Sequence, residues 1–296
     1  MPTPSLREKL KHGEFFFAPG IQDMITAVIA REIGFDAFYA TGFWLTASAY
    51  GLPDAGIATY SQMVDRVQTL VRCAGDTPVI ADADTGYGGL LNVRHTVRGY
   101  ESAGAAAIQI EDQEFPKKCG HTPFKRVVPT AVMVAKIRVA IEARENPDTL
   151  IIARTDARQS EGLAGTLRRS EAYARAGADI VFPEALTSED EMRQVCAAID
   201  APLMANMADG GLTPVLSATV LKELGFSCAI FPSLASLASA AAARHALLRL
   251  KETGASRNAD VPLYDFDAFC RLIGFEAVWD FERRWADVDA AATPSD

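Results

Sequence analysis

The 296-residue sequence has no run of basic residues and no stripe in which aromatic and basic residues alternate. Its formal net charge is −9, which excludes the class of nucleic-acid-binding proteins, because those proteins must neutralise phosphates. An acidic overall balance still permits an anionic small-molecule substrate, since the local field of a site decides what binds there. We therefore expect no nucleic-acid partner.

Long hydrophobic runs are also missing. Residues 1–11 are polar and contain no apolar core of the kind found in secretory signals. The longest apolar stretch, 230–250, is interrupted by three serines, Arg244 and His245, which is typical of an alanine-rich core helix. We therefore expect no membrane partner.

Cysteine is scarce and scattered. The five cysteines have neither the spacing of a disulfide framework nor that of a zinc site, which predicts a reduced, cytoplasmic protein. Cys119 lies between charged residues and is discussed below. The other four lie in apolar contexts and are predicted in the core: Cys73, Cys196, Cys228 and Cys270.

The sequence also lacks a dinucleotide fingerprint and any linker. The turn after the first apolar run, residues 19–23, reads Pro-Gly-Ile-Gln-Asp instead of G-x-G-x-x-G, which excludes a Rossmann start. No low-complexity tract or internal repeat divides the chain. We therefore interpret residues 1–296 as one domain, in which residues 255–296 form a C-terminal helical tail that packs on a neighbouring subunit.

What the sequence does contain is eight short apolar runs that alternate with longer segments of helical spacing. The runs are nearly continuous, as expected for parallel strands that are covered on both faces. Eight units at roughly thirty-residue spacing predict a closed (β/α)₈ barrel of the TIM type. The predicted strands are Phe15–Ala18, Ala37–Ala40, Val79–Ala83, Ala107–Ile110, Leu150–Ala153, Asp179–Phe182, Leu203–Ala205 and Cys228–Phe231.

The intervening segments have recognisable helix ends. Thr213, followed by Pro214, is a typical helix start. Glycine follows several helices just before the next strand, where a left-handed residue is favoured. The predicted helices are Ile21–Ile33, Tyr60–Arg72, Val93–Ser102, Ala131–Arg144, Leu163–Ala176, Glu189–Ile199 and Pro214–Leu224.

Three acidic residues follow adjacent strands. Asp82 and Asp84 are two apart, which predicts that they point to the same side of the third strand, and Glu111 ends the fourth. Without matching cations nearby, converging carboxylates would repel one another unless a hard divalent ion lay among them. Oxygen ligands favour Mg²⁺ or Mn²⁺ over zinc. The alternative, a glycine-rich turn at 84–89 with solvated aspartates, leaves Glu111 unexplained.

A second cluster, Lys117-Lys118-Cys119-Gly120-His121, follows the fourth strand. A thiol at its ordinary pKa of about 8.5 is protonated at neutral pH and can donate a proton. Neighbouring cations instead favour the thiolate, which is a nucleophile, so the residues leave both roles open for Cys119. Arg154, at the end of the fifth strand, is either a clamp for a carboxylate or a partner of Asp156 or Glu184.

These clusters resemble the isocitrate lyase/phosphoenolpyruvate mutase superfamily over essentially the whole chain. The Lys-Lys-Cys-Gly-His pentapeptide is the most specific element, because in that superfamily it marks the carbon–carbon lyase branch. The matching segments are Gly51-Leu52-Pro53-Asp54, 81–89 (Ala-Asp-Ala-Asp-Thr-Gly-Tyr-Gly-Gly), Ile110-Glu111-Asp112-Gln113, 117–121, Ala153-Arg154-Thr155-Asp156, Phe182-Pro183-Glu184 and Asn206-Met207.

The resemblance implies a site for Mg²⁺, with Mn²⁺ as the alternative ion. Asp82 would be the central ligand, and Asp84 and Glu111 would contribute largely through water. The carboxylate and the 2-hydroxyl of a small carboxylic acid would chelate the ion. The substrate-binding residues implied by the resemblance are Thr41, Gly42, Phe43, Gly120, Glu184 and Asn206.

The implied reaction is a retro-aldol (retro-Claisen) cleavage of a 2-hydroxy di- or tricarboxylic acid into a 2-oxo acid and a carboxylic acid. Cys119, on a loop that closes over the site, would protonate the leaving carbanion. Tyr39 is the candidate base for the 2-hydroxyl proton. The catalytic set implied is Cys119, Tyr39, Arg154, Lys117, His121 and Asp54. The superfamily also exchanges its last helix between subunits, which implies a homotetramer built from two helix-swapped dimers.

Two departures from methylisocitrate lyases bear on the substrate. Phe43 and Trp44 stand where small residues are expected, and Leu237 stands about where an arginine for a third carboxylate is expected. Residues 209–211, Asp-Gly-Gly, also differ from the expected Glu-Phe-Gly. Together they favour a dicarboxylate with an apolar substituent, of the dimethylmalate kind.

Four other functions remain open. The first two are an oxaloacetate decarboxylase or hydrolase and a phosphonate mutase of the same superfamily. The others are a Schiff-base aldolase that uses Lys117 or Lys118 and a barrel that binds without catalysis. The aldolase is disfavoured because both lysines lie beyond the strand end.

Overall fold

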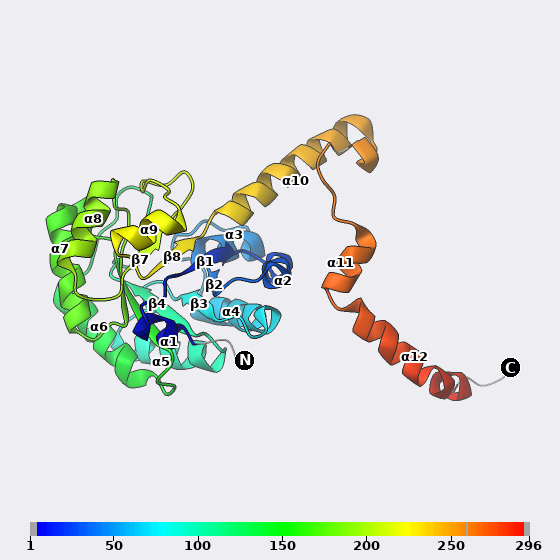
Figure 1. The fold of residues 1–296 in the computed structure, drawn as a ribbon, viewed down its shortest axis with the longest axis horizontal. Coiled ribbons are helices and arrows are strands. Elements are labelled where there is room, and N and C mark those ends of the chain that lie inside the picture. Colours follow the sequence, from blue (N-terminus) through cyan, green and yellow to red (C-terminus); the bar gives the residue numbers. More distant parts are fainter. Residues whose placement is uncertain (1–4, 259, 293–296) are drawn as a thin grey trace. The chain divides into compact units, whose positions relative to one another are not determined.

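A computed structural model describes residues 5–258 and 260–292. The chain forms two compact units, Met1–Ala238 and Ser239–Asp296. In the first unit, eight parallel strands follow the order β6-β5-β4-β3-β2-β1-β8-β7, and a parallel bridge between Val181 and Leu203 joins the two ends (Figure 1). This is the predicted (β/α)₈ barrel. The strands are β1 (Phe16–Ile21), β2 (Phe38–Ala40), β3 (Val79–Asp82), β4 (Ala107–Glu111), β5 (Leu150–Thr155), β6 (Ile180–Pro183), β7 (Met204–Asn206) and β8 (Cys228–Phe231).

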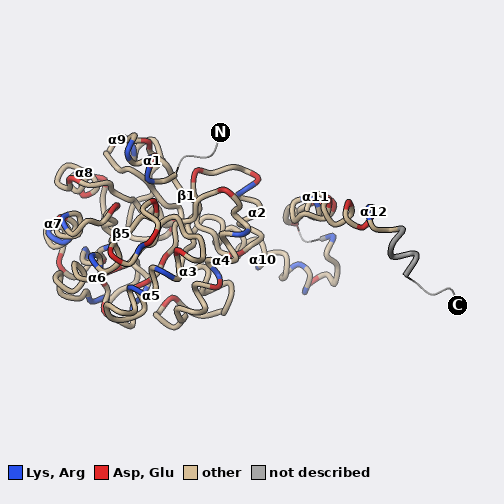
Figure 2. Tube along the Cα trace, turned by 90° about the horizontal axis from the view of Figure 1, so that it is seen from below, with Lys and Arg blue, Asp and Glu red and all other residues tan. Residues whose placement is uncertain are grey.

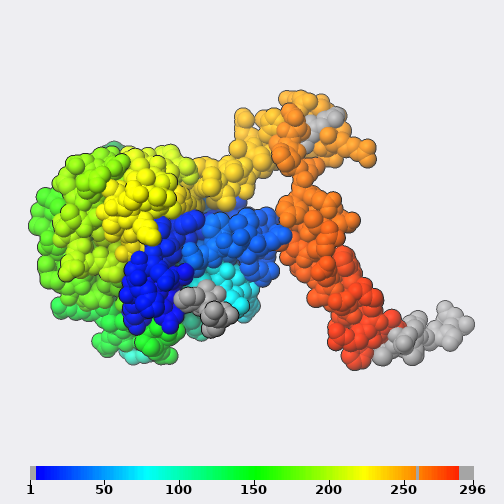
Figure 3. All heavy atoms as spheres, in the orientation of Figure 1, coloured from blue at the N-terminus to red at the C-terminus, as the bar shows by residue number. Residues whose placement is uncertain are grey.

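Helices surround the strands of this unit. In the space-filling view, the visible surface of this unit is made by segments coloured from blue near its N-terminal end to yellow near β8 (Figure 3). Residues of both charges are interspersed around the helices (Figure 2). The helices are α1 (Leu6–Lys11), α2 (Met24–Ile33), α3 (Gly42–Tyr50), α4 (Tyr60–Ala74), α5 (Leu90–Ser102), α6 (Thr130–Ala143), α7 (Arg158–Arg175), α8 (Glu189–Ala198) and α9 (Ala218–Leu224).

The second unit is helical. Helix α10 (Leu234–Thr253) begins in the first unit and continues into the second. It is followed by the short 3₁₀ turn η1 (Ser256–Asn258), α11 (Phe266–Leu272) and α12 (Phe275–Ala292). Among the described residues, no helix combines the length and the apolar character needed to cross a membrane.

All eight predicted strands are confirmed, although their ends differ by up to three residues. The helix predicted from Pro214 is wrong at its start. It begins at Ala218, because the Ser217 hydroxyl accepts a hydrogen bond from the Val220 amide at 3.3 Å and caps the first turn. The sequence also gave no sign of α3, whose preceding residue, Thr41, makes no side-chain cap.

Alternation along the strands places the polar residues. The barrel interior is filled by apolar side chains such as Ile80, Ile152 and Phe182. Because side chains in a strand repeat with a period of two, the residue two positions further on faces the same interior. The interior rows of β3 to β7 thus end in polar side chains near the carboxyl ends of these strands: Asp82, Gln109, Glu111, Arg154, Glu184 and Asn206.

Candidate active site

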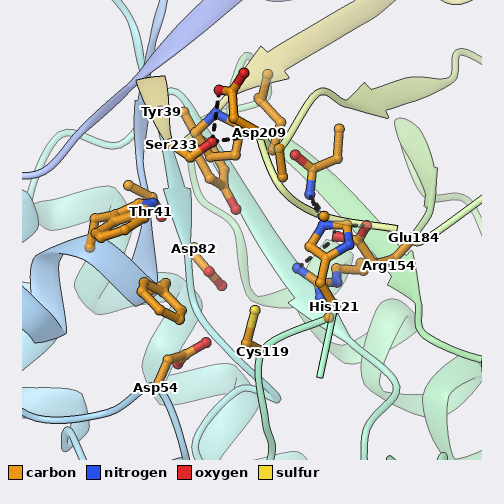
Figure 4. Close-up of a pocket in the computed structure, with 18 of the residues that line it drawn as sticks. Tyr39, Thr41, Asp54, Asp82, Cys119, His121, Arg154, Glu184, Asp209 and Ser233 are labelled. Carbon is orange, nitrogen blue, oxygen red and sulfur yellow. Dashed lines mark hydrogen bonds and ion pairs between the residues drawn. The ribbon is translucent and has the colours of Figure 1, made fainter. Parts of the chain in front are cut away.

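A cavity of about 180 Å³ opens at the carboxyl ends of the strands (Figure 4). Active sites of (β/α)₈ barrels lie at this end. Three of the predicted site residues, Gly42, Asp84 and Glu111, do not line the cavity but lie behind its wall. The cavity does bring together the other twelve: Tyr39, Thr41, Phe43, Asp54, Asp82, Lys117, Cys119, Gly120, His121, Arg154, Glu184 and Asn206.

Asp82 is held from three directions. Its Oδ1 accepts hydrogen bonds from the Asp84 amide (3.0 Å) and from Gln109 Nε2 (3.2 Å), and its Oδ2 accepts one from the Gly42 amide (3.3 Å). A Cβ at Gly42 would lie 2.8 Å from Oδ2, so only glycine allows this approach. Asp84 lies two residues beyond the end of β3, in the left-handed region (φ 49°), so strand alternation does not set the direction of its side chain.

The acidic cluster contains a cation of its own, contrary to the prediction. Lys117 is buried, and its Nζ forms ion pairs with Asp54 and, at 2.7 Å, with Asp84. Burial opposes the charge, but Asp84, Glu111 and Asp54 together raise the pKa of Lys117 well above its ordinary value. Burial also raises the pKa of Asp84, to about 6, against the effect of Lys117. A protonated ammonium cannot form a Schiff base, which disfavours the aldolase.

Glu111 has a carboxylate oxygen that is free to bind a divalent ion. Its Oε1 is buried and has no hydrogen-bond partner, and burial raises the pKa of its carboxyl well above the ordinary value. Within residues 5–258 and 260–292, no three His, Cys, Asp or Glu side chains are close enough to form a preassembled metal cluster. Mg²⁺ commonly takes only one or two carboxylates and keeps several waters. Asp82 and the unpartnered Glu111 oxygen are therefore carboxylate groups that fit such an ion.

Cys119 faces the cavity from the loop after β4 (Figure 4). Burial raises the pKa of its thiol, and only the backbone amide of His121 and the more distant Arg154 act against this. The two neighbouring lysines do not favour the thiolate, because Lys117 turns to the carboxylates and Lys118 is exposed. The structure thus favours the protonated thiol, which is the form of an acid.

Tyr39 lies at the end of β2 and donates a hydrogen bond to Gln109 Oε1 at 2.8 Å. Burial, followed by the charge of Asp82, raises the pKa of the phenol well above its ordinary value. At neutral pH, Tyr39 is therefore protonated, and a protonated phenol can orient a substrate hydroxyl but cannot remove its proton.

Arg154 is surrounded by carboxylates. Its Nε and Nη2 donate to Asp156 at 2.9 and 3.0 Å, and its Nη1 lies 3.3 Å from Glu184. Of the two alternatives that the sequence left open, the pairing with Asp156 is confirmed, and Arg154 also lines the cavity. Asp156, Glu184 and Glu111 overcome the effect of burial and raise its pKa well above the ordinary value, so the guanidinium stays charged.

His121 joins the loop to the far wall of the cavity. Its Nδ1 accepts a hydrogen bond from the Leu212 amide at 3.1 Å, which assigns the ring proton to Nε2. Nε2 lies 3.5 Å from Glu184 Oε1, and Asn206 donates to Glu184 Oε2 at 2.9 Å. This chain of contacts fixes Glu184 beside Arg154.

Some residues around the site were not among the predicted functional residues. Gln109 holds both Asp82 and Tyr39, and its signal was a polar residue at an interior position of an apolar strand. Trp44 also lines the cavity, as do Asp209 and Ser233, whose side chains are joined by a 3.0 Å hydrogen bond. No local pattern marks Ser233, because the parallel pairing of β8 with β7 is what brings it beside the loop after β7.

Comparison with known proteins agrees with this geometry. The family model described as phosphoenolpyruvate phosphomutase matches residues 6–251. The chain belongs to this family. It is 41% identical to a 2,3-dimethylmalate lyase from Eubacterium barkeri over 95% of this chain and 97% of that one. It is 42% identical to a 2-methylisocitrate lyase from Aeropyrum pernix over 98% and 92% of the two chains. These relatives confirm the predicted enzyme class, a carbon–carbon lyase.

Solved structures of family members have the same barrel. Oxaloacetate acetylhydrolase, solved with 3,3-difluorooxalacetate, has a TM-score of 0.90 and 32% identity, with 96% of this chain and 97% of that one covered. Phosphonopyruvate hydrolase, solved with oxalate and Mg²⁺, has a TM-score of 0.85 and 30% identity, covering 95% and 98%. At least one member of the superfamily therefore binds a divalent cation.

Proposed function

We propose that this lyase uses Mg²⁺ and splits the C2–C3 bond of a 2-hydroxy dicarboxylic acid that carries an apolar substituent. The observation that carries the proposal is the position of Cys119, whose protonated thiol lines the same small cavity as Asp82, Tyr39 and Arg154. An acid thus lies opposite the groups that would hold the 2-oxo-acid half of the substrate.

In this proposal, Asp82 and Glu111 would hold the ion, and Asp84 would orient water beside it. The ion would neutralise the carboxylates and make the 2-hydroxyl of the substrate more acidic. Thr41 and the backbone of Phe43 bind the carboxylate of the 2-oxo-acid half, while the Gly42 amide stays on Asp82. The charged Arg154 stabilises the negative charge that develops on the substrate oxygens, and Tyr39 accepts the hydrogen bond of the 2-hydroxyl and orients it.

The bond changes follow from these positions. The 2-hydroxyl passes its proton through water to the Asp84 carboxylate, C2 becomes a carbonyl carbon, and the electrons of the C2–C3 bond pass to C3 and its carboxylate. Cys119 then delivers its proton to C3, and solvent reprotonates the thiolate after the products leave. Lys117 and Asp54 position the beginning of the loop, and Gly120, His121, Glu184 and Asn206 position its far side.

The part of the cavity opposite Cys119 argues against a third carboxylate (Figure 4). It contains the Asp209–Ser233 pair, and the lining of the cavity also includes Trp44, Ile230 and Pro232. No cation among the described lining residues lies in this group, since the lining cations come from the loop and from β5. A carboxylate placed beside Asp209 would lack a partner and meet a like charge. Leu237, where an arginine was sought, is not a lining residue.

We predict that 2,3-dimethylmalate is turned over with a kcat/KM about 100-fold higher than that of 2-methylisocitrate. A missing partner for a buried charged group is worth about 3 kcal/mol, and each 1.4 kcal/mol is about tenfold. The purified protein is assayed with Mg²⁺, with pyruvate detected by a coupled reaction. Replacing Asp209 with asparagine removes the like charge and should bring the two kcat/KM values closer together. The control Asp200→Asn, at an exposed position, should leave their ratio unchanged. Equal turnover of both acids by the unaltered protein would remove the basis of this preference.

We also propose that the protein is a homo-oligomer in which the C-terminal helices of one copy pack on the barrel of another. In the first unit, an apolar groove of about 380 Å³ is lined by β1, α2, the end of β8 and the first turn of α10, including Ile29, Ile33 and Phe231. Helix α10 buries only Ser236 among its described residues, so most of its surface is exposed. In the second unit, α12 exposes Phe281 and Trp285.

The Phe281→Asp substitution on α12 is therefore predicted to reduce the mass in solution from a multiple of 31.8 kDa towards 31.8 kDa. A charge on an apolar contact is costly when the contact is buried between copies. Light scattering after size-exclusion chromatography measures the mass. The matched control is Arg284→Asp, on the polar face of the same helix. A protein that is monomeric before substitution contradicts the helix exchange.

A further inference from the structure

The loop that carries Cys119 is held at its base by Lys125. The loop, residues 114–126, leaves the barrel at an antiparallel bridge between Gln113 and Val127. Lys125 is almost at its end, yet its side chain is only 1% exposed. Its Nζ donates one hydrogen bond to Asp156 Oδ1 at 2.9 Å and another to the carbonyl oxygen of Gly120. A buried ammonium thus connects the centre of the loop to the end of β5.

Asp156 receives a second cation at the same time. Arg154 donates two hydrogen bonds to its carboxylate, and the Asp156 amide in turn donates to Asp112 Oδ1 at 2.9 Å. Burial would raise the pKa of Asp156, but Arg154 and Lys125 together hold it well below the ordinary value. If Lys125 withdrew, Arg154 would still neutralise this carboxylate. The ion pair can therefore break without leaving a buried, unpaired charge.

The loop backbone also rests directly on Arg154. A Cβ at Gly120 would lie 2.3 Å from Arg154 Nη2 and 2.7 Å from Glu184 Cγ, so the peptide at Gly120 packs against both side chains. Lys125 donates a hydrogen bond to the carbonyl oxygen of this same residue. Cys119, the preceding residue, is thereby fixed relative to Arg154.

We propose that Lys125 is a positioning residue whose ion pair with Asp156 latches the Cys119 loop over the cavity and aligns Cys119 with Arg154. The inference rests on the proposed function only in that the latched thiol is the acid of the reaction. Lys125 does not line the cavity and touches no substrate, so it acts through Gly120 and Asp156. Release of this one pair lets substrate enter and products leave.

The test is the reactivity of Cys119 towards N-ethylmaleimide in Lys125→Met, which keeps the length of the side chain and removes its charge. Alkylation is followed at the level of peptides, so that Cys119 is distinguished from the other four cysteines. We expect Cys119 to be alkylated at least about tenfold faster than in the unaltered protein, because the loop is open more of the time. We also expect kcat to fall at least about tenfold, with a smaller change in KM, because misplaced groups slow the chemical step.

Two further variants complete the test. Lys125→Arg restores the charge and should restore slow alkylation, which a purely structural role would not require. Arg126→Met, a neighbouring residue with an exposed side chain, should change neither rate. If Lys125→Met does not fold, the same measurements on Lys125→Gln decide the question. Alkylation and kcat both unchanged in a folded variant overturn the latch. A lack of lyase turnover in the unaltered protein would overturn the proposed function instead, and alkylation would still report on the latch.

Discussion

Replacing Cys119 with serine is expected to lower kcat for the cleaved 2-hydroxy acid by at least about 10³-fold, because general acids contribute about 10²–10⁴ in rate. Serine has nearly the same size, so substrate binding and metal binding should persist and KM should change little. A hydroxyl is a far weaker acid than a thiol. The loss should therefore appear in the chemical step, which single-turnover kinetics measure directly.

The pH profile adds an independent reading of the same substitution. An acid works only below its own pKa, so kcat of the unaltered protein should fall as the pH rises through the pKa of Cys119. Burial raises that pKa, which moves the alkaline decline above the range of an ordinary thiol, about 8.5. Cys119→Ser should lack this decline, and Cys73→Ser, a thiol on α4 outside the cavity, should retain both rate and profile. Undiminished turnover in Cys119→Ser would favour a metal-assisted decarboxylase.

The second large effect concerns the proposed metal site. Asp82→Asn is expected to lower kcat/KM at least about 10³-fold, since the ion supplies several kcal/mol of charge stabilisation. It should also abolish stabilisation of the fold by Mg²⁺. At one hundred times its Kd, a ligand adds about 2.7 kcal/mol, which corresponds to a rise in Tm of about 5 °C.

Thermal unfolding with Mg²⁺ and with a chelator measures the stabilisation by the ion without reference to activity. The unaltered protein should show the rise in Tm, and so should Asp200→Asn, an exposed carboxylate in the loop after α8. Asp82→Asn should unfold at one temperature under both conditions. A metal-dependent rise that survives in Asp82→Asn would place the ion elsewhere, and no rise in the unaltered protein would contradict the metal dependence itself.

The barrel could be predicted because its signals are local. A parallel strand such as Leu150–Thr155 is apolar on both faces, and glycines such as Gly177 (φ 100°) mark the ends of helices. The site followed from topology, since carboxyl ends of parallel strands share one rim. Helix α3 was missed because its mean character is apolar and no side chain caps its start.

The contacts that the loops make could not be predicted from the sequence. The pairing of Lys117 with Asp54 and Asp84 depends on how the loop folds back, and nothing in the sequence around Lys117 marks partners 63 and 33 residues away. The same holds for Lys125. Nothing in the sequence around it predicts that its side chain is buried and forms an ion pair with Asp156. The pKa directions of Cys119 and Tyr39 depend on burial, so their protonated states became assignable only with the structure.

The most direct test of the account follows the proton that Cys119 delivers. The protein is incubated with Mg²⁺ and 2,3-dimethylmalate in D₂O, and the products are identified by nuclear magnetic resonance. The account predicts pyruvate and propionate in equal amounts, with a single deuterium at C2 of the propionate in one configuration, and almost no product from Cys119→Ser. Cleavage of oxaloacetate to oxalate and acetate, with 2,3-dimethylmalate left intact, would contradict it.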